Sequence, residues 1–268
     1  MLKRMLGLLI DRSKIVYFFK TVVKMKTSNP ILTGKAFRVN ARDLPQDELM
    51  TVKGTATKAL VLMMLVVASA SWIWQLSTPQ HALAFLFPAA IGGFLCALAT
   101  TFKPSWAPIT APCYALLEGL VLGSTSVYFE SIFPGIAFQA TTLTLGTFVI
   151  MFLIYSSGAI AVNEKLRTGI IAATGGIALV YIISMLCRFF GISVGMIHGN
   201  SPLSIGFSLL VVGVAAFNLL LDFDRIEQGQ RYGAPKYMEW YGAFGLLVTL
   251  IWLYVEILHL LSKIRGRK

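Results

Sequence analysis

The chain has 268 residues, of which 56% are hydrophobic and only 13% are charged. Soluble domains contain about 45–50% apolar and about 25% charged residues, and a single soluble core could not bury this much apolar surface. The net charge of +11 could also indicate a nucleic-acid-binding protein, but no recognition motif accompanies it, so we expect no nucleic-acid partner. The composition predicts an all-α, polytopic membrane protein whose first partner is the lipid bilayer.

The first 57 residues are predicted to form a basic cytoplasmic region ahead of a transmembrane bundle over residues 58–268. Twelve of the 23 Lys and Arg residues, but only four of the 12 acidic residues, precede Ala59. Such a basic excess is typical of the cytoplasmic side of a membrane protein. Residues 1–26 mix apolar and basic residues, which fits either an amphipathic helix on the membrane surface or a disordered basic tail. Residues 27–57 contain two prolines and two glycines and are predicted to be rich in loops.

Seven apolar segments follow, each near the ~20 residues that a membrane-spanning helix requires. In chain order they cover residues 58–75, 81–102, 113–129, 135–160, 169–190, 202–221 and 241–261. The first ends in Trp72 and Trp74, an aromatic pair typical of the membrane interface. Ser201 is predicted to cap the sixth, which begins at Pro202. The short connections favour antiparallel neighbours in one bundle.

The charged loops indicate which side of the membrane each segment end faces. If the amino terminus is cytoplasmic, most basic residues of the loops also lie on the cytoplasmic side. These residues are Lys103, Lys165, Arg167, Arg225, Arg231 and Lys236. The carboxyl-terminal tail breaks this pattern, because seven crossings put its four basic residues, from Lys263 to Lys268, on the other side. Either the tail tolerates that side or the seventh segment turns back without crossing.

Small residues recur at the spacing of helix contacts. Gly119 and Gly123 are one turn apart in the third segment, and Gly92 and Cys96 are one turn apart in the second. Small side chains let helices approach closely in lipid, so we expect close packing at both places. The three cysteines have no metal-ligand spacing and are expected to be packing residues.

The sixth segment ends in two carboxylates, Asp222 and Asp224, directly after a long apolar run. A carboxylate in hydrocarbon costs about 2.5–3.5 kcal/mol at a helix centre, so it is retained where it faces protein, water or an ion. The spacing of Asn218, Asp222 and Arg225 puts all three on one helix face as a polar stripe. Asp222 is therefore either neutralised by Arg225 or part of an ion- or proton-linked site. Asp224 points elsewhere and is expected in the headgroup zone.

Further acids lie in or beside apolar segments. Glu118 has no basic residue nearby in the sequence, so it serves an ion path or donates one interhelical hydrogen bond as a neutral acid. Glu256 and His259 are one turn apart, but a single Glu-x-x-His pair offers too few ligands for a di-iron site. Glu239 stands at the entrance of the seventh segment and is predicted to be a surface residue. No serine nucleophile elbow or zinc-protease histidine pair is present, so we expect no enzymatic activity.

Five strings of the chain carry a resemblance to a known family. They are SNPIL (Ser28–Leu32), MTVKGTATKA (Met50–Ala59), YALLEGLVLGSTS (Tyr114–Ser126), LLLDFDRIEQG (Leu219–Gly229) and APKYMEWYGAFGLLVTLIWLYVEILHLL (Ala234–Leu261). The chain resembles the bacterial branch of the Bax inhibitor-1 family over roughly residues 27–265. The resemblance implies a seven-helix bundle in which six helices surround the last. It also implies a role in calcium leak and ion homeostasis, with the bacterial inner membrane as the expected location.

The resemblance further implies a pH-sensitive gate, in which an aspartate late in the sixth helix pairs with one in the seventh. Asp222 matches the first aspartate by its Asp-Phe-Asp-Arg-Ile context. The position of the second aspartate holds Thr249, which cannot titrate as a carboxylate does. The paired gate is therefore not carried over, and Glu118 and Glu256 are the candidates for a second acid.

The leading hypothesis is a pH-sensitive cation leak channel, for calcium or protons, lined or gated by Asp222, Glu118 and Glu256. Calcium prefers several oxygen ligands, so a calcium ion at Asp222 and Glu118 is the one candidate ligand, and no other cofactor is expected. The alternative is a non-conducting interaction protein that regulates a membrane partner such as a protease. A transporter of small organic molecules is weaker, because no pair of interrupted helices occurs in matching halves. The oligomeric state is left open.

Overall fold

The computed structural model describes residues 48–75, 79–190, 199 and 201–267. The predicted membrane-surface helix or tail, and most of the loop-rich stretch, lie outside the described residues. The described chain contains seven long α-helices and, besides them, one isolated bridge between Leu49 and Pro235. In order, the helices are α3 (Val52–Trp74), α4 (Pro79–Phe102), α5 (Ala107–Ile132), α6 (Ile136–Ser156), α7 (Glu164–Phe189), α9 (Pro202–Arg231) and α10 (Met238–Arg265), with a short 3-10 turn, η2 (Pro104–Trp106), before α5.

Length and composition support the predicted membrane bundle. Within the described ranges, six helices are long and apolar enough to cross a membrane, namely α3, α4, α6, α7, α9 and α10. The exception is α5, which has 26 residues but carries Glu118 and the hydroxyls of Ser124, Thr125 and Ser126. This helix packs against α3, α4 and α10, so its less apolar side chains face other helices. The all-α, polytopic fold is confirmed.

The starts of three helices follow from local chemistry. The side chain of Thr51 accepts a hydrogen bond from Gly54 N–H, so α3 begins at Val52 and not at Lys58 as predicted. Ser201 caps α9 as predicted, by accepting from Ser204 N–H at 3.2 Å. The start of α5 was predicted too late, after Pro112. Its first turn already holds a proline, Pro108, at a position where the missing N–H removes no helix hydrogen bond.

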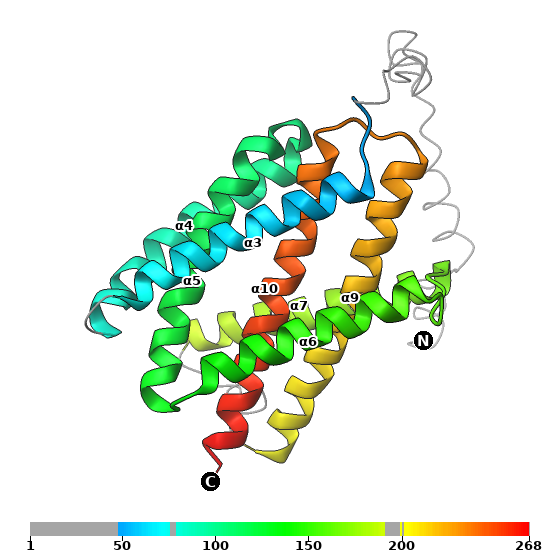
Figure 1. Ribbon diagram of the computed structural model, residues 1–268. Helices are drawn as coiled ribbons and strands as arrows, with labels where there is room; N and C mark the ends of the chain where they lie inside the picture. The colour runs from blue at the N-terminus through cyan, green and yellow to red at the C-terminus, as the bar shows by residue number, and fades with distance from the viewer. Residues whose placement is uncertain (1–47, 76–78, 191–198, 200, 268) are drawn as a thin grey trace, which may run out of the picture. The chain divides into compact units, whose positions relative to one another are not determined.

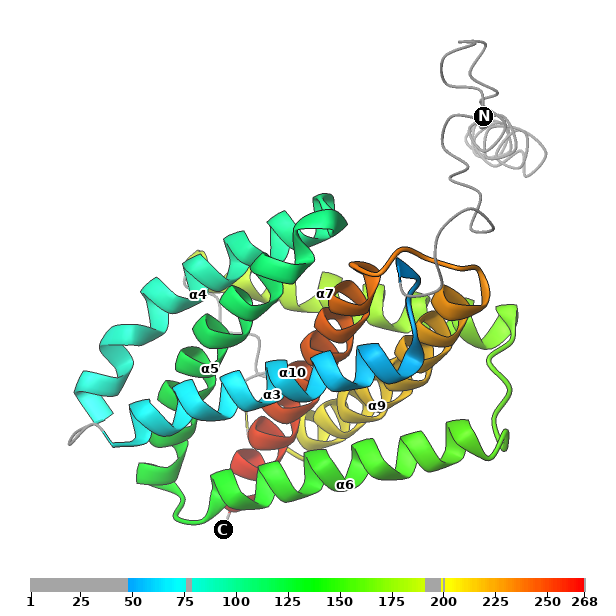
Figure 2. The same ribbon diagram turned by 45° about the horizontal axis from the view of Figure 1, so that its top comes forward.

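The last helix lies at the centre of the bundle, as the family resemblance implied. Figures 1 and 2 show α10 running between α3, α5, α6 and α9, and it packs directly on all four. More than half of its most apolar stretch is buried, against a third or less in the other five spans. The two remaining helices lie further out, because α4 packs mainly on α5 and α7 mainly on α9.

One continuous helix carries α10 from one end of the bundle to the other. Beside its first turn, Met50 N–H donates to Ala234 O at 2.7 Å. At its last turn, Arg265 donates to Pro134 O at 2.7 Å and to Gln139 Oε1 at 2.8 Å, both at the α5–α6 turn. The helix has no break at which the chain could turn back, and it is long and apolar enough to cross a membrane. Two of the basic residues at this end, Lys263 and Arg265, thus donate hydrogen bonds to oxygen atoms of the protein.

Glycines allow close helix packing where their spacing predicted it. A Cβ atom on Gly119 would lie 2.5 Å from Val66 O, and one on Gly123 would lie 2.9 Å from Ala70 Cα. Both distances are far below van der Waals contact, so the glycine face of α5 rests directly on the α3 backbone. Close approach of this kind is a main source of helix association in lipid.

Candidate functional site

Asp222 lies where α9 packs against the central helix. The residue is 7% exposed, and its neighbours Leu221 and Phe223 are buried as well. The hydroxyl of Thr249 on α10 donates to Asp222 Oδ2 at 2.5 Å. Arg225 Nη1 is 3.7 Å from Oδ1, and the Arg225 side chain is 66% exposed. A neutral hydroxyl therefore holds this carboxylate across the helix pair, with a more distant cation on its own helix.

Thr249 connects two acceptors through a single hydroxyl. Besides Asp222, its Oγ1 has Gly245 O within reach, at 3.3 Å in the same helix. A hydroxyl has only one proton to donate. The shorter distance to Asp222 Oδ2 indicates where that proton points when the carboxylate is ionised.

The predicted polar stripe on α9 is interrupted at Asn218. Its amide Nδ2 donates to Thr174 Oγ1 of α7 at 2.8 Å and to Val214 O at 2.9 Å. Both amide N–H groups thus have acceptors away from Asp222. The stripe reduces to Asp222 and Arg225, and Asn218 instead ties α9 to α7.

Asp224 points away from Asp222 and joins the contact between α7 and α9. Its Oδ2 accepts from Arg167 Nη2 and from Gln228 Nε2, each at 2.6 Å. A close guanidinium and an amide therefore satisfy this carboxylate. We interpret Asp224 as an ion pair that fastens α7, separate from the Asp222–Thr249 contact.

Glu118 lies at a different helix contact, between α4 and α5. Its Oε2 is 3.3 Å from the place where a Cβ on Gly93 would stand. Within the part of the chain that the structure describes, no hydrogen bond or ion pair involves its carboxylate. Asp222 is at the α9–α10 contact, so the structure places Glu118 and Asp222 at different helix contacts.

Glu256 has a polar environment of its own. It is buried, and the Tyr181 hydroxyl lies 2.9 and 3.0 Å from its two oxygens, while Trp252 Nε1 donates at 3.1 Å. Seven residues of α10 separate it from Thr249, which is about 10 Å along a helix axis. Glu256 therefore faces α7 and does not meet Asp222. No group of three or more His, Cys, Asp or Glu among the described residues is placed to hold a metal ion.

The prediction that Glu239 is a surface residue is wrong, because its side chain is fully buried. It forms an ion pair with Lys58, accepts from both N–H and Oγ1 of Thr51 at 2.9 Å, and has Lys236 Nζ at 3.4 Å. Residues 48–51, directly before α3, lie against the start of α10. Gly54 leaves the necessary room, since a Cβ there would lie 2.2 Å from Glu239 Oε1.

Sequence reasoning missed Thr51, Lys58 and Tyr181 as partners of buried acids. Thr51 and Lys58 are 188 and 181 residues from Glu239, and Tyr181 is 75 residues from Glu256. No spacing rule reaches across such separations. The one local signal for the buried Glu239 was Gly54. This glycine lies in the first turn of α3, one turn before Lys58.

Comparison with known proteins adds one finding. The profile of a protein family described as Bax inhibitor 1 like matches residues 29–266. The matched range takes in the seven long helices that the structure describes, including both sides of the Asp222–Thr249 contact. Among proteins of curated function and among solved structures, neither comparison gives a match.

Proposed function

Because the chain belongs to the Bax inhibitor 1 like family and is an integral membrane protein, we propose that it is a pH-sensitive cation leak protein with Asp222 as the titrating group. The proposal places it in a bacterial inner membrane with a cytoplasmic amino terminus. It assigns no enzymatic activity, and calcium enters as a permeant ion. The observation that carries the proposal is the hydrogen bond from Thr249 to Asp222 across the α9–α10 contact.

Asp222 differs from the other acids at its end of the bundle in how its charge is balanced. Asp224 has Arg167 at 2.6 Å, Glu227 has Arg231 at 2.5 Å, and Glu239 has two lysines. Among the described residues, the one cation near Asp222 is Arg225, which is 3.7 Å away and mostly exposed. Its interhelical partner is neutral, so adding a proton to Asp222 breaks no close ion pair.

Protonation would change the α9–α10 contact directly. A protonated Asp222 becomes a hydrogen-bond donor, and the Thr249 hydroxyl can then turn to Gly245 O in its own helix. A hydrogen bond to a charged group contributes about 1.5–3 kcal/mol and a neutral one about 0.5–1.5 kcal/mol. A loss of about 1 kcal/mol changes the ratio of two conformations roughly five-fold.

The proposed switch therefore weakens the link between α9 and the central helix as the pH falls. In the ionised state the charge-assisted bond holds α9 against α10. In the protonated state the pair separates more readily and a cation path opens beside it. Leak is expected to increase several-fold from mildly alkaline to mildly acidic pH, which makes this contact the two-state element of the protein.

The test is calcium efflux from liposomes that contain the purified protein, measured across that pH range. Asp222→Asn should remove the pH response, because an amide does not titrate there. Thr249→Val should raise the leak at neutral pH, whereas Thr249→Ser, which keeps the hydroxyl, should behave as the original chain does. Asp224→Asn is the matched control, since it removes a carboxylate two residues away that belongs to another contact.

The result that sinks the proposal is an unchanged pH response in Asp222→Asn. Absence of flux at every pH would also reject it. If such an inactive protein copurified with a stoichiometric membrane partner, the alternative of a non-conducting interaction protein would be supported.

A further inference from the structure

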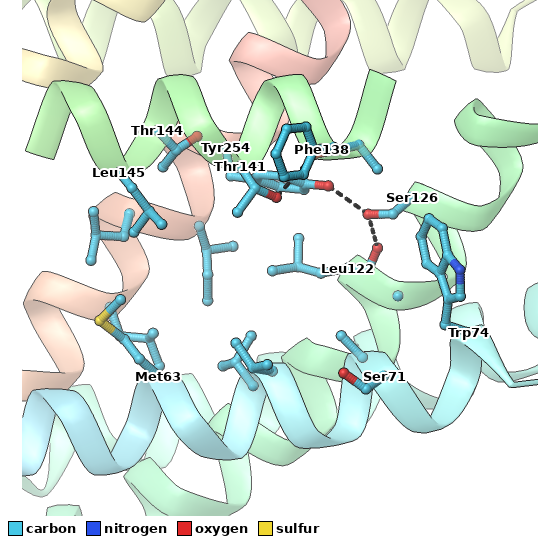
Figure 3. Close-up of a pocket in the computed structure, with 18 of the residues that line it drawn as sticks. Met63, Ser71, Trp74, Leu122, Ser126, Phe138, Thr141, Thr144, Leu145 and Tyr254 are labelled. Carbon is cyan, nitrogen blue, oxygen red and sulfur yellow. Dashed lines mark hydrogen bonds between the residues drawn. The ribbon is translucent and has the colours of Figure 1, made fainter. Parts of the chain in front are cut away.

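A cavity of about 670 Å³ lies on a different face of α10 from Asp222. Its walls come from four helices, with α3 and α6 on opposite sides and α5 and α10 completing it (Figure 3). The α10 residues that line it are Leu247, Leu250, Ile251 and Tyr254, whereas Thr249, on the same stretch, faces α9. Its volume falls within the range of about 300–1,000 Å³ of ligand pockets.

The chemistry of the lining fits hydrocarbon and not an ion. None of the residues that line the cavity is charged, and most are aliphatic or aromatic. Most of its hydroxyls have partners within the protein: Ser126 donates to Leu122 O at 2.6 Å and is 2.7 Å from Tyr254 Oη, as Figure 3 shows. Thr141 and Thr144 donate to carbonyls of their own helix at 2.9 and 2.8 Å. The lining therefore offers an ion no counter-charge, and its other polar side chains, those of Ser71, Trp74 and Gln75, gather at the C-terminal end of α3.

The length of the cavity along α3 is comparable to the thickness of one leaflet of a bilayer. On α3 the lining extends from Met63 to Trp74 and Gln75, and eleven residues of helix cover about 16 Å. The hydrocarbon core of a bilayer is about 30 Å thick, so one leaflet contributes about 15 Å. Trp74 is 47% exposed at the end of its helix, the place where aromatic residues lie at the level of the headgroups.

The rim of the cavity faces outward from the bundle. Val67 on α3 is 62% exposed, and Phe138 and Leu145 on α6 are exposed as well. Both helices are long and apolar enough to span a membrane, so this outward face lies against lipid. The opening thus joins the cavity to the hydrocarbon of the bilayer.

We propose that this cavity binds one acyl chain of a membrane phospholipid. The acyl chain would enter between α3 and α6. The headgroup of the lipid would lie beside Trp74 and Gln75, and the end of the acyl chain would lie near Met63.

The test is photolabelling of the full-length protein in lipid nanodiscs. The probe is phosphatidylglycerol with a diazirine in the middle of one acyl chain, at trace level among unlabelled phosphatidylglycerol and phosphatidylethanolamine. Peptide mass spectrometry then maps the adducts. Adducts on the α3 and α6 residues of the cavity should exceed several-fold those on equally exposed residues elsewhere, such as Ile91 on α4, which is 63% exposed.

Filling the cavity should remove this excess. Val67→Trp places a larger side chain at the mouth, and Leu145→Trp does so from the opposite wall if the first variant fails to fold. Ile91→Trp is the matched control and should leave the labelling unchanged. The proposal is overturned by uniform labelling of all lipid-facing helices, by labelling that persists in a folded filled variant, or by cross-links showing a second protein chain at these positions.

Discussion

Asp222 on α9 and Glu239 on the central helix α10 are both buried carboxylates, but their charges are balanced in opposite ways. Glu239 has an ion pair with Lys58, a second lysine at 3.4 Å and two hydrogen bonds from Thr51 at 2.9 Å. Asp222 has one hydroxyl at 2.5 Å and an exposed guanidinium at 3.7 Å. Removing one partner of a buried ion pair is strongly destabilising, because it leaves the other charge unpaired. A buried carboxylate that is held by a neutral group can change its protonation state with little loss of stability.

The two sites also connect different parts of the chain. The Glu239 cluster fastens the segment before α3 to the start of α10, together with the backbone hydrogen bond from Lys236 N–H to Glu48 O at 2.8 Å. The Asp222 contact joins the middle of α10 to α9. We infer that the first site anchors the central helix and that the second is free to switch.

The largest effect is expected when the anchor is broken. Glu239→Gln leaves Lys58 and Lys236 without their carboxylate and should lower the free energy of unfolding by about 3 kcal/mol. Asp222→Asn, which keeps an acceptor for Thr249, should lower it by less than about 1 kcal/mol. Denaturant unfolding in mixed detergent micelles measures both.

Glu164→Gln provides the control for the anchor, because its ion pair with Arg167 has an 85% exposed carboxylate and should contribute less than about 1 kcal/mol. Equal losses in Glu239→Gln and Glu164→Gln would contradict the assignment of Glu239 as the anchor. A larger loss in Asp222→Asn than in Glu239→Gln would reverse the comparison.

A somewhat smaller effect is expected from filling the space that the anchor uses. Gly54→Ala places a Cβ 2.2 Å from Glu239 Oε1 and should destabilise the protein by about 1–3 kcal/mol. In the Glu239→Ala background the same change should cost little, because the clashing carboxylate is gone. The double-mutant cycle measures this coupling.

Gly146→Ala in α6 is the matched control for this cycle, because nothing lies within 4 Å of its added Cβ. Alanine is the better helix former, so that change should be neutral or stabilising by up to about 1 kcal/mol. Additive losses in the Gly54→Ala and Glu239→Ala pair would show that the glycine does not make room for the carboxylate.

The sequence predicted the bundle well because the bilayer imposes a local rule. A membrane-spanning helix needs about 20 apolar residues, and this rule locates α4 and α10 within a few residues. The start of α3 was missed because the Thr51 cap extends that helix into polar sequence. Burial of Glu239 could not be predicted, since its partner Lys58 is 181 residues away and no local pattern indicates which segment covers the start of α10.

The candidate site was predictable only in part. The apolar run before Asp222 indicated an unusual carboxylate, and the family resemblance singled out Thr249 as the opposite position. Thr249 contacts Asp222, whereas Glu118 and Glu256 face other helices. These contacts depend on how each helix is rotated and packed. The spacing of acids along a sequence carries no information on either.

The smallest effect concerns the cation beside Asp222. Arg225 is largely exposed and 3.7 Å from Oδ1, so Arg225→Gln should change the free energy of unfolding by less than about 1 kcal/mol. Its positive charge favours the ionised carboxylate, and removing it should move the midpoint of the leak's pH response upward by less than about one pH unit. Efflux from liposomes at graded pH measures this shift.

Arg231→Gln is the control for this prediction, because the Arg231 guanidinium pairs with Glu227 and its removal should leave the midpoint of the pH response unchanged. A midpoint that moves with Arg231 and not with Arg225 would mean that the titrating group lies at the Glu227 contact, and the contrast between a fixed anchor and a switching Asp222 would no longer hold.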